Sequence, residues 1–589
     1  MESNFNNSDL LRFNINTKGQ CLFIQRWREI FNDKTIDRYK CRLTNAHSIL
    51  DEYLDVLKKI NQSIIKESNL LPLFDECLKK IKDDSILKNN HDTLRKSILE
   101  NLNKKQTNVN KISNLEVLIK DLNANYLNWI LSDLKNNLLE DNLHEIQLDI
   151  EILATELVSR GWNKKSLYRL LRVIFLRSNE EFYEKWSKFT SSLTGDKKEF
   201  ICYIEINQSS LNNEEMIELF NEKYTVIRGN KLKNNLIQRT NYNELNTCKL
   251  YLEFKQYVYT DNLDSFIEYI SQELANIESE FIYFNEKIEF NKSKVLVLLS
   301  TNRVITYNML LNNTKEYFKS SNISDIDKEQ LLRFTNIKKK LENNEIDTRL
   351  KNVLNQYKLG YSSDSIENWF SSFWFALESL VATNQYENII EQIINITTPI
   401  LTLNYPKEIL KNLIGDCNRC EVDLKEFDIN GKTDEDIIRI AEIIKDNSSF
   451  SILIERSAKN TLLTIRIKSI QKMLQNSSTL KKFYVSHYEN LEFHLKRLYR
   501  IRNSFVHSAN IDYDLYPVTI HLYSYLRDVL EEIFVAIEKD CSDNIEEIFS
   551  CSNIKYNMLI DILNKSGKGD FNVEILCFNN SCSNLSNFS

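Results

Sequence analysis

Apolar residues recur every three or four positions through the first part of the chain, from about residue 20 to residue 180. The spacing is clear in residues 49–57 and again in residues 146–157. This period places apolar side chains on one face of a helix. Polar segments such as KNNHD and NKKQTN separate the runs and behave as connectors. The pattern predicts a packed scaffold of amphipathic helices over residues 1–195, with a binding surface as the alternative interpretation.

The hydrophobic pattern changes near Gly195. Four segments become rich in β-branched and aromatic residues that partly alternate with polar ones, which is typical of strands. They are residues 199–207, 223–229, 248–260 and 294–300. Helical patterns lie between some of them, at residues 213–220 and 263–278. We therefore predict a small α+β module over residues 196–305. The chain contains neither GxxxxGK nor GxGxxG, which argues against an intrinsic NTPase.

The helical period returns after about residue 320 and continues to about residue 548. We expect interruptions near Pro399, Pro406 and the stretch of residues 415–431. Residues 306–548 are therefore predicted to form a C-terminal helical bundle. The remaining residues, 549–589, end in the Asn/Ser-rich sequence FNNSCSNLSNFS and are expected to form a partly disordered extension. The predicted fold class is mainly α, with a small α+β module in the centre.

Composition supports the helical interpretation. The chain has nine glycines and four prolines in 589 residues, roughly a fifth of the usual share. At this length one hydrophobic core is not enough, so we expect three or four domains. The N-terminal sequence MESNFNNSDLLRF lacks a basic segment followed by an apolar run, and the longest aliphatic run covers only residues 295–299. We therefore expect no secretory signal, no membrane span and a cytoplasmic location.

The cysteines suggest free thiols. Eleven are scattered from Cys21 to Cys582, without the secretory context in which disulfides persist. Cys417 and Cys420, in GDCNRCE, have the spacing of a zinc half-site, but the chain lacks an equally convincing second half. We predict an ordinary pair of thiols, no bound metal and no cofactor. A zinc site that recruits a distant cysteine such as Cys577 is the less favoured alternative.

Charge is concentrated in one C-terminal segment. Between Ser451 and His507 there are eleven basic residues and three acidic ones, in a chain whose net charge is −7. The basic residues are Arg456, Lys459, Arg466, Lys468, Lys472, Lys481, Lys482, Lys496, Arg497, Arg500 and Arg502. A basic surface on an acidic protein suits a polyanion such as RNA, while a solvated helix face is the alternative. Lys496, Arg497 and Arg500 are the candidate RNA-binding residues.

The same segment contains a candidate catalytic set. Residues 494–514 read HLKRLYRIRNSFVHSANIDYD, with Arg502, Asn503 and His507 in an R-N-x-x-x-H arrangement. On an ideal helix Asn503 and His507 share a face, whereas Arg502 lies about 140° round the axis from His507. The arginine must therefore reach round the helix, act at a bend, or be complemented by another chain.

This residue set fits metal-independent RNA cleavage by transesterification. A histidine with a pKa near neutrality can move protons between the ribose 2′-hydroxyl and the leaving 5′-oxygen. A fixed guanidinium can stabilise the negative charge of the phosphorane. These two roles fit His507 and Arg502.

The residues around the motif resemble a known family. LYRIRNSFVHSA resembles the signature of the HEPN superfamily, in particular its Apea-like branch. ENWFSSFWFALESLV (residues 367–381) resembles the paired helix of that branch, and PVTIHLYSYLRDVLEEIF (residues 517–534) its closing helix. The resemblance covers about residues 320–540. It implies a HEPN-type helical bundle and an endoribonuclease that leaves a 2′,3′-cyclic phosphate and a 5′-hydroxyl, with Arg502, Asn503 and His507 as its catalytic residues.

The paired helix adds a supporting residue. Its apolar stripe leaves the carboxylate of Glu378 facing the core, where burial normally demands a cationic partner. Arg502 is the obvious candidate, because in the family an acidic residue on this helix helps to orient the motif. A simple surface glutamate is the alternative.

The resemblance also implies partners. The family forms a composite site from two facing HEPN domains, so a chain with one motif is expected to form a homodimer through this domain. We also expect two apolar stripes of the domain to exceed what one bundle core needs. They are Trp369/Phe373/Trp374 and Leu522/Tyr525/Leu526/Val529.

The family suggests a biological setting as well. Many of its members are toxins or act in bacterial immunity, where they arrest growth by cutting RNA in antiphage defence such as abortive infection. The N-terminal body is large enough to sense a phage-derived or nucleotide trigger, and no membrane partner is expected. One alternative is a catalytically silent module that binds RNA or a nucleotide. Another is a structural protein whose basic segment packs against an acidic partner.

Overall fold

The computed structural model is mainly helical, with a small antiparallel sheet in the middle of the chain, as the sequence predicts. The residues that the structure describes are 5–32, 44–63, 67, 70–104, 107–220, 224–239, 245–299, 303–309, 335–337, 339–340, 345–363, 365–382, 388–431, 433–508, 515–539 and 544–580. They belong to two compact units. The helical unit comprises residues 1–26, 34–156 and 322–589, and the α+β unit comprises residues 27–33 and 157–321.

Amphipathic helices form the N-terminal part of the chain, as the three-and-four spacing predicts. On α3 the side chains of Ile49, Tyr53 and Leu57 are all buried. The helices begin at polar caps, because an Asn or Thr oxygen can accept from a free backbone N–H of the first turn. Asn45 does so for α3, and Thr107 for α7. The helices are α1 (Asn7–Leu11), α2 (Lys18–Ile30), α3 (Ala46–Asn61), α4 (Leu70–Asp83), α5 (Ser85–Asn90), α6 (Asp92–Asn103), α7 (Asn108–Glu140) and α8 (Leu143–Ser159).

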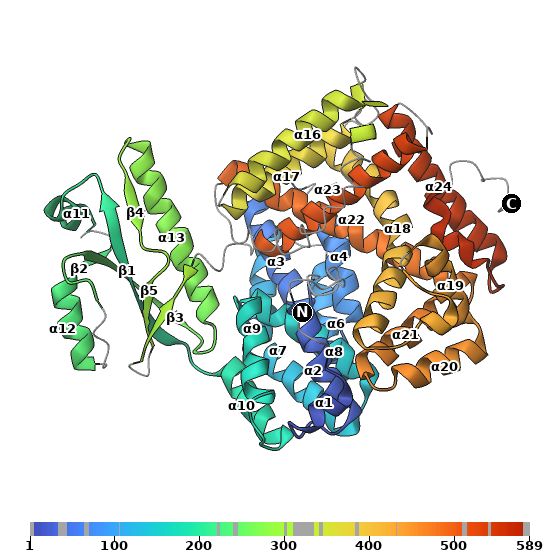
Figure 1. The fold of residues 1–589 in the computed structure, drawn as a ribbon, viewed down its shortest axis with the longest axis horizontal. Helices are drawn as coiled ribbons and strands as arrows, with labels where there is room; N and C mark the ends of the chain where they lie inside the picture. Colours follow the sequence, from blue (N-terminus) through green and yellow to red (C-terminus); the bar gives the residue numbers. More distant parts are fainter. Residues whose placement is uncertain are drawn as a thin grey trace. The chain divides into compact units, whose positions relative to one another are not determined.

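The C-terminal part of the helical unit is a second set of packed helices (Figure 1). α17 contacts both α16 and α23, and α18 contacts both α22 and α24. The elements are α16 (Glu345–Ser362), α17 (Ile366–Val381), α18 (Ile389–Arg419), η5 (Lys425–Phe427), α19 (Asp434–Lys445), α20 (Asn447–Ser457), α21 (Thr461–Met473), α22 (Ser477–Ser508), α23 (Leu515–Glu538), α24 (Ile545–Ser566) and η6 (Val573–Asn580). Leu559, Leu563 and Ile575 are buried in the core, so folded chain continues beyond residue 548. Residues 581–589 lie outside the described residues.

The expected interruptions at Pro399 and Pro406 are wrong. Both prolines lie inside the continuous helix α18. A proline in a helix interior loses a backbone hydrogen bond and costs roughly 3 kcal/mol. Apolar side chains of α18, such as Ile400 and Leu410, are fully buried, and this packing offsets the local penalty.

The two apolar stripes are used inside one chain. Trp369, Phe373 and Trp374 on α17 are fully buried, and so are the stripe residues of α23 from Leu522 to Val529. Because α17 and α23 pack directly on each other, the stripes form a core of the protomer itself. The interpretation that they exceed the needs of a single core is therefore wrong.

The α+β unit contains a six-stranded antiparallel sheet. The strands are β1 (Lys198–Ser209), β2 (Thr225–Arg228), β3 (Leu250–Val258), β4 (Ile288–Phe290), β5 (Val295–Leu298) and β6 (Val304–Tyr307). Their order is β2-β3-β1-β5-β6, and β4 also pairs with β1. The central β1 pairs with β3 in a register that joins Lys198 to Val258 and Glu205 to Tyr251.

Helices cover both faces of this sheet. α11 (Asn213–Phe220) and α13 (Leu263–Tyr283) bury their apolar residues against one face, and α12 (Gly229–Arg239) packs against the other (Figure 1). The unit also includes α9 (Lys164–Phe175) and α10 (Phe182–Thr194), which the hydrophobic period groups with the N-terminal helices.

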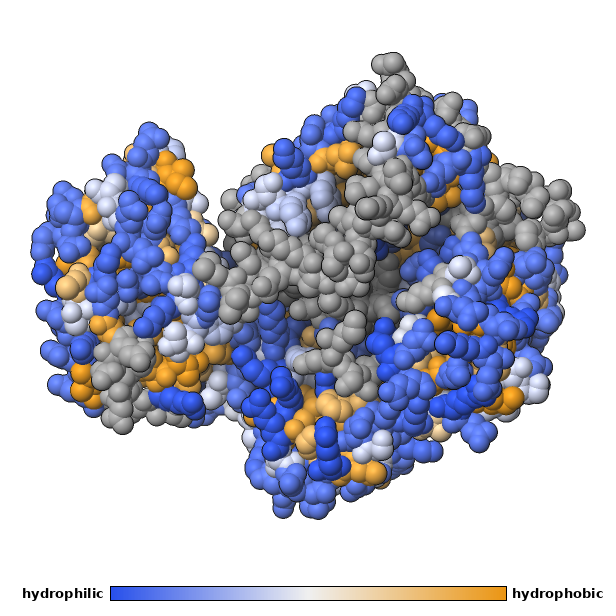
Figure 2. All heavy atoms as spheres, viewed as in Figure 1, coloured by the Kyte–Doolittle hydropathy of each residue, from blue (hydrophilic) through white to orange (hydrophobic). Residues whose placement is uncertain are grey.

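Within the described residues, no helix combines the length and the apolar character needed to cross a bilayer. On the face drawn in Figure 2, hydrophilic residues predominate and apolar residues form small separate patches.

Candidate functional site

The predicted catalytic residues lie near the C-terminal end of α22. This helix runs without interruption from Ser477 to Ser508, so the whole motif lies within one helix. Arg502 and Asn503 are therefore close neighbours on it, while position 507 lies about 140° round the axis from position 502. The backbone of His507 belongs to the last turn, but its side chain lies outside the part of the chain that the structure describes.

The structure confirms the predicted pairing of Arg502 with Glu378. An Nη2 atom of Arg502 lies 3.7 Å from Oε1 of Glu378 on α17. Nη1 of Arg502 donates a hydrogen bond of 3.2 Å to Oδ1 of Asn503. The guanidinium carbon also lies 6.0 Å from the ring centroid of Phe375. Two predicted catalytic residues and the predicted supporting residue are thus together, with Phe375 as a neighbour that the sequence did not indicate.

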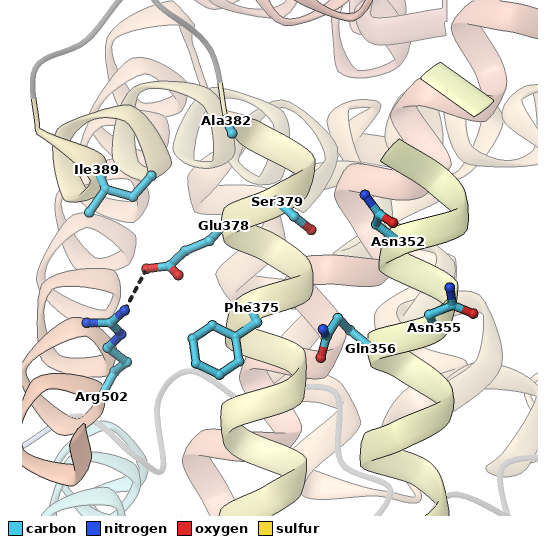
Figure 3. Close-up of a pocket in the computed structure, with 9 residues that line it drawn as sticks. All are labelled: Asn352, Asn355, Gln356, Phe375, Glu378, Ser379, Ala382, Ile389 and Arg502. Atoms are coloured by element: carbon cyan, nitrogen blue, oxygen red, sulfur yellow. Dashed lines mark ion pairs between the residues drawn. The ribbon is translucent and has the colours of Figure 1, made fainter. Parts of the chain in front are cut away.

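These side chains line an open pocket of about 800 Å³. Its lining residues are Asn352, Asn355, Gln356, Phe375, Glu378, Ser379, Ala382, Ile389 and Arg502. Figure 3 shows Phe375 and Glu378 pointing from α17 toward the side where Arg502 lies, with the amide side chains of α16 on the other side. The pocket is of the size that small-ligand sites usually have.

Arg502 and Glu378 retain unused hydrogen-bonding capacity. A guanidinium has five N–H donors and a carboxylate accepts through two oxygens. Within the described residues, Arg502 makes only the bond to Asn503, and its Nε is buried without a partner. The 3.7 Å contact of Glu378 is too long for a hydrogen bond. The side chains are 25% and 18% exposed respectively, so both can meet a ligand in the pocket.

Arg497 and Arg500 have a different role from the one predicted. Nε of Arg497 donates to Glu52 at 2.9 Å and its Nη2 to Glu76 at 2.7 Å, while Nη2 of Arg500 donates to Glu52 at 2.6 Å. Arg497 and both glutamates are buried, and Arg500 is nearly so. Their guanidinium groups therefore form ion pairs that join α22 to α3 and α4. We correct their assignment as RNA-binding residues.

The basic segment as a whole is partly neutralised inside the protein. Lys496 pairs with Glu492, one turn earlier on the same helix. Arg456 pairs with Glu426, and Arg466 with Asp416. The count of charges between Ser451 and His507 did not include Glu426 and Asp416, because both lie outside that segment. Lys468, Lys472 and Lys482 remain exposed.

Glu52 and Glu76 are the site-supporting residues that sequence reasoning missed. Glu52 is 445 residues from Arg497 in the chain, so no local motif could connect them. The available signal was a charged residue among the buried positions of an amphipathic helix, beside Tyr53. The same signal did identify Glu378, because its candidate partner, Arg502, belonged to the R-N-x-x-x-H motif.

The Cys417 and Cys420 pair lies in the hydrophobic core at the end of α18. Burial, and then the charge of Asp416, raises the pKa of the Cys417 thiol to about 12. In the described residues no group of three or more His, Cys, Asp or Glu side chains could hold a metal ion. The eight cysteines of these residues are thiols, and none of them is joined in a disulfide.

Comparisons of the chain with protein-family models, with curated proteins and with solved structures give no match.

Proposed function

We propose that the chain is a metal-independent endoribonuclease of the HEPN type, with its site at the end of α22. The observation that carries the proposal is the arginine at the rim of the pocket. Arg502 is held between Glu378 and Asn503 and keeps most of its donors free of protein partners in the described residues. A guanidinium fixed in this way is suited to the charge of a phosphorane.

The proposed reaction is a transesterification. The ribose 2′-oxygen attacks the neighbouring phosphorus, the bond to the 5′-oxygen breaks, and a 2′,3′-cyclic phosphate and a 5′-hydroxyl remain. His507 moves the proton from the 2′-hydroxyl to the departing 5′-oxygen. Arg502 stabilises the charge on the phosphorane. Asn503 and Glu378 are positioning residues, because their contacts fix the orientation of the Arg502 guanidinium.

The proposal includes a regulated cytoplasmic effector of antiphage defence or a toxin, active as a homodimer. Arg497 and Arg500 support regulation by the N-terminal helices, because they tie α22 to Glu52 and Glu76 only a few residues before Arg502. A trigger that moves α3 or α4 would therefore act on the helix that carries the motif. The dimer rests on the single motif per chain and on the angular separation of positions 502 and 507.

The test is cleavage of a labelled single-stranded RNA by the full chain in the presence of EDTA. We expect cleavage products that end in a 2′,3′-cyclic phosphate. The His507→Ala variant should lose cleavage while its RNA affinity stays within a few-fold, because affinity rests on many phosphate contacts. Loss of wild-type activity on chelation would refute the mechanism.

The same measurement separates the alternatives. RNA binding by the wild type without cleavage would favour the catalytically silent module. Neither binding nor cleavage would favour the structural protein, a reading that the internal ion pairs of the basic segment also fit.

A further inference from the structure

One aromatic ring of α17 differs from the others. Trp369, Phe370, Phe373 and Trp374 are buried in the core, whereas Phe375 is 41% exposed and lines the pocket. Full burial of a side chain of this size stabilises a protein by roughly 1.5–3 kcal/mol, and an exposed ring forgoes part of this free energy. An exposed aromatic surface beside a guanidinium is also the platform on which proteins stack the bases of single-stranded RNA.

A carboxylate lies one turn away from this ring. Glu378 follows Phe375 by three residues on α17, so the two side chains share a face of the helix. Figure 3 shows both directed toward Arg502, with Ile389 at the edge of the same space. The oxygens of Glu378 accept no hydrogen bond within the described residues. An ionised carboxylate only accepts hydrogen bonds, so a fitting ligand presents donors beside a flat ring.

We propose that this pocket binds a guanine base presented by single-stranded RNA, a proposal that rests on the proposed function and names its substrate preference. The Watson–Crick edge of guanine carries two adjacent donors, N1–H and the N2 amino group, which match the two oxygens of Glu378. Adenine and cytosine place a ring acceptor beside their amino group, and uracil has a single N–H between two carbonyls. Only guanine meets the carboxylate with two donors.

The geometry leaves room for stacking. Phe375 supplies one flat face, and the guanidinium of Arg502 lies 6.0 Å from the centre of the ring. A base between them needs about 7 Å, twice the stacking rise of about 3.4 Å in nucleic acids. The partly exposed Arg502 side chain must therefore move outward by about 1 Å as the base enters. The donors of Arg502 that make no hydrogen bond within the described residues remain available to a phosphate of the bound RNA.

The test measures binding of the full chain to short 2′-O-methyl oligonucleotides by fluorescence anisotropy. These oligonucleotides lack the attacking hydroxyl, so they bind without being cleaved. They are oligouridylates with one central guanine or one central adenine. We expect the guanine oligonucleotide to bind about tenfold more tightly, as a matched pair of hydrogen bonds provides. Phe375→Ala should weaken its binding about tenfold through lost stacking. Ile452→Ala on α20 is the matched control, because Ile452 is 44% exposed outside the pocket.

A change of base preference tests the role of Glu378 directly. An amide has one acceptor and one donor, the complement of an adenine edge. Glu378→Gln should therefore reverse the preference from guanine to adenine, which a merely structural role would not do. Equal binding of the two oligonucleotides by the wild type would overturn the proposal, as would an unaffected Phe375→Ala variant. Binding of guanosine monophosphate without discrimination between the oligonucleotides would overturn it too, because the ligand of the pocket would then be a free nucleotide and not a base of RNA.

The outcomes for the pocket and for the ribonuclease are separate. A guanine preference in a protein that cleaves no RNA refutes only the ribonuclease. Cleavage by a protein without base preference refutes only the proposal that the pocket binds guanine.

Discussion

At the scale of single residues, Glu52 shows how one buried carboxylate stabilises the region that leads to the motif. It accepts hydrogen bonds from both Arg497 and Arg500. Burial alone would raise the pKa of Glu52, but the two arginines outweigh burial and lower its pKa to about 2. The carboxylate is thus charged in the folded protein, and its removal leaves two guanidinium groups without their shared partner.

We predict that Glu52→Ala destabilises the helical unit by about 3–5 kcal/mol, because breaking a buried ion pair leaves an uncompensated charge. The matched control is Glu489→Ala, which removes an exposed pair between α22 and Lys79 of the neighbouring helix α4. Exposed pairs contribute about 1 kcal/mol or less. Urea unfolding followed by circular dichroism measures both variants. Equal destabilisation by the two substitutions would contradict the assigned role of Glu52.

At the scale of elements, α22 is held along its length by several neighbours. Near its middle, His487 stacks on Tyr405 of α18, with ring centroids 3.6 Å apart and planes 8° from parallel. Burial lowers the pKa of His487 to about 3. The folded protein therefore keeps this imidazole neutral at pH values where the unfolded chain, with a pKa near 6.5, already takes up a proton.

This difference predicts a pH dependence of stability. The unfolded state binds the additional proton first as the pH falls, so the contribution of His487 is complete above about pH 6.5 and declines from there toward pH 3. His487→Phe retains a ring against Tyr405 and removes the titration. We expect the thermal midpoint of this variant to fall less steeply than that of the wild type between pH 6.5 and 4.5. Glu52 is unchanged in the His487→Phe variant, so its titration contributes equally to both curves. Parallel curves for the two proteins would show that His487 is not the group responsible.

At the scale of the whole molecule, the helical unit joins both ends of the chain. Residues 34–156 and 322–589 belong to one compact unit, and Arg497 finds its partners Glu52 and Glu76 in its N-terminal part. A fragment of residues 320–548 would expose these buried charges and would also lack most of α24. The hydrophobic pattern predicts a bundle over residues 306–548, whereas in the structure these residues share one compact unit with the N-terminal helices. Functional experiments therefore need the full chain.

The assembly prediction also belongs to this scale. If two protomers complete one site, Arg502→Ala and His507→Ala proteins, each inactive alone, should regain partial RNA cleavage when mixed after subunit exchange. The physical reason is that each heterodimer holds one intact Arg502 and one intact His507. Sedimentation at the assay concentration measures the mass of the species. A monomer that cleaves RNA would contradict the composite site.

The sequence by itself determined the type of most elements. Helical and strand periods are local properties of the chain, and they placed helices such as α3 and α22 and the strands β1, β2, β3 and β5. They did not indicate the short strands β4 and β6. It also predicted the Glu378–Arg502 pair, because a carboxylate within an apolar stripe requires a cation and the motif offered one. The ribonuclease activity, the dimer and the trigger remain predictions of the resemblance.

Only the tertiary structure decided which side chains are available at the site. Arg497 and Arg500 bind Glu52 and Glu76 inside the protein. Helix α18 continues through both of its prolines, and Phe375 is exposed at the pocket. The physical reason is the same in each case. Burial and ion pairing depend on neighbours that are distant in the sequence, and a local pattern carries no information about them where no motif points to the partner.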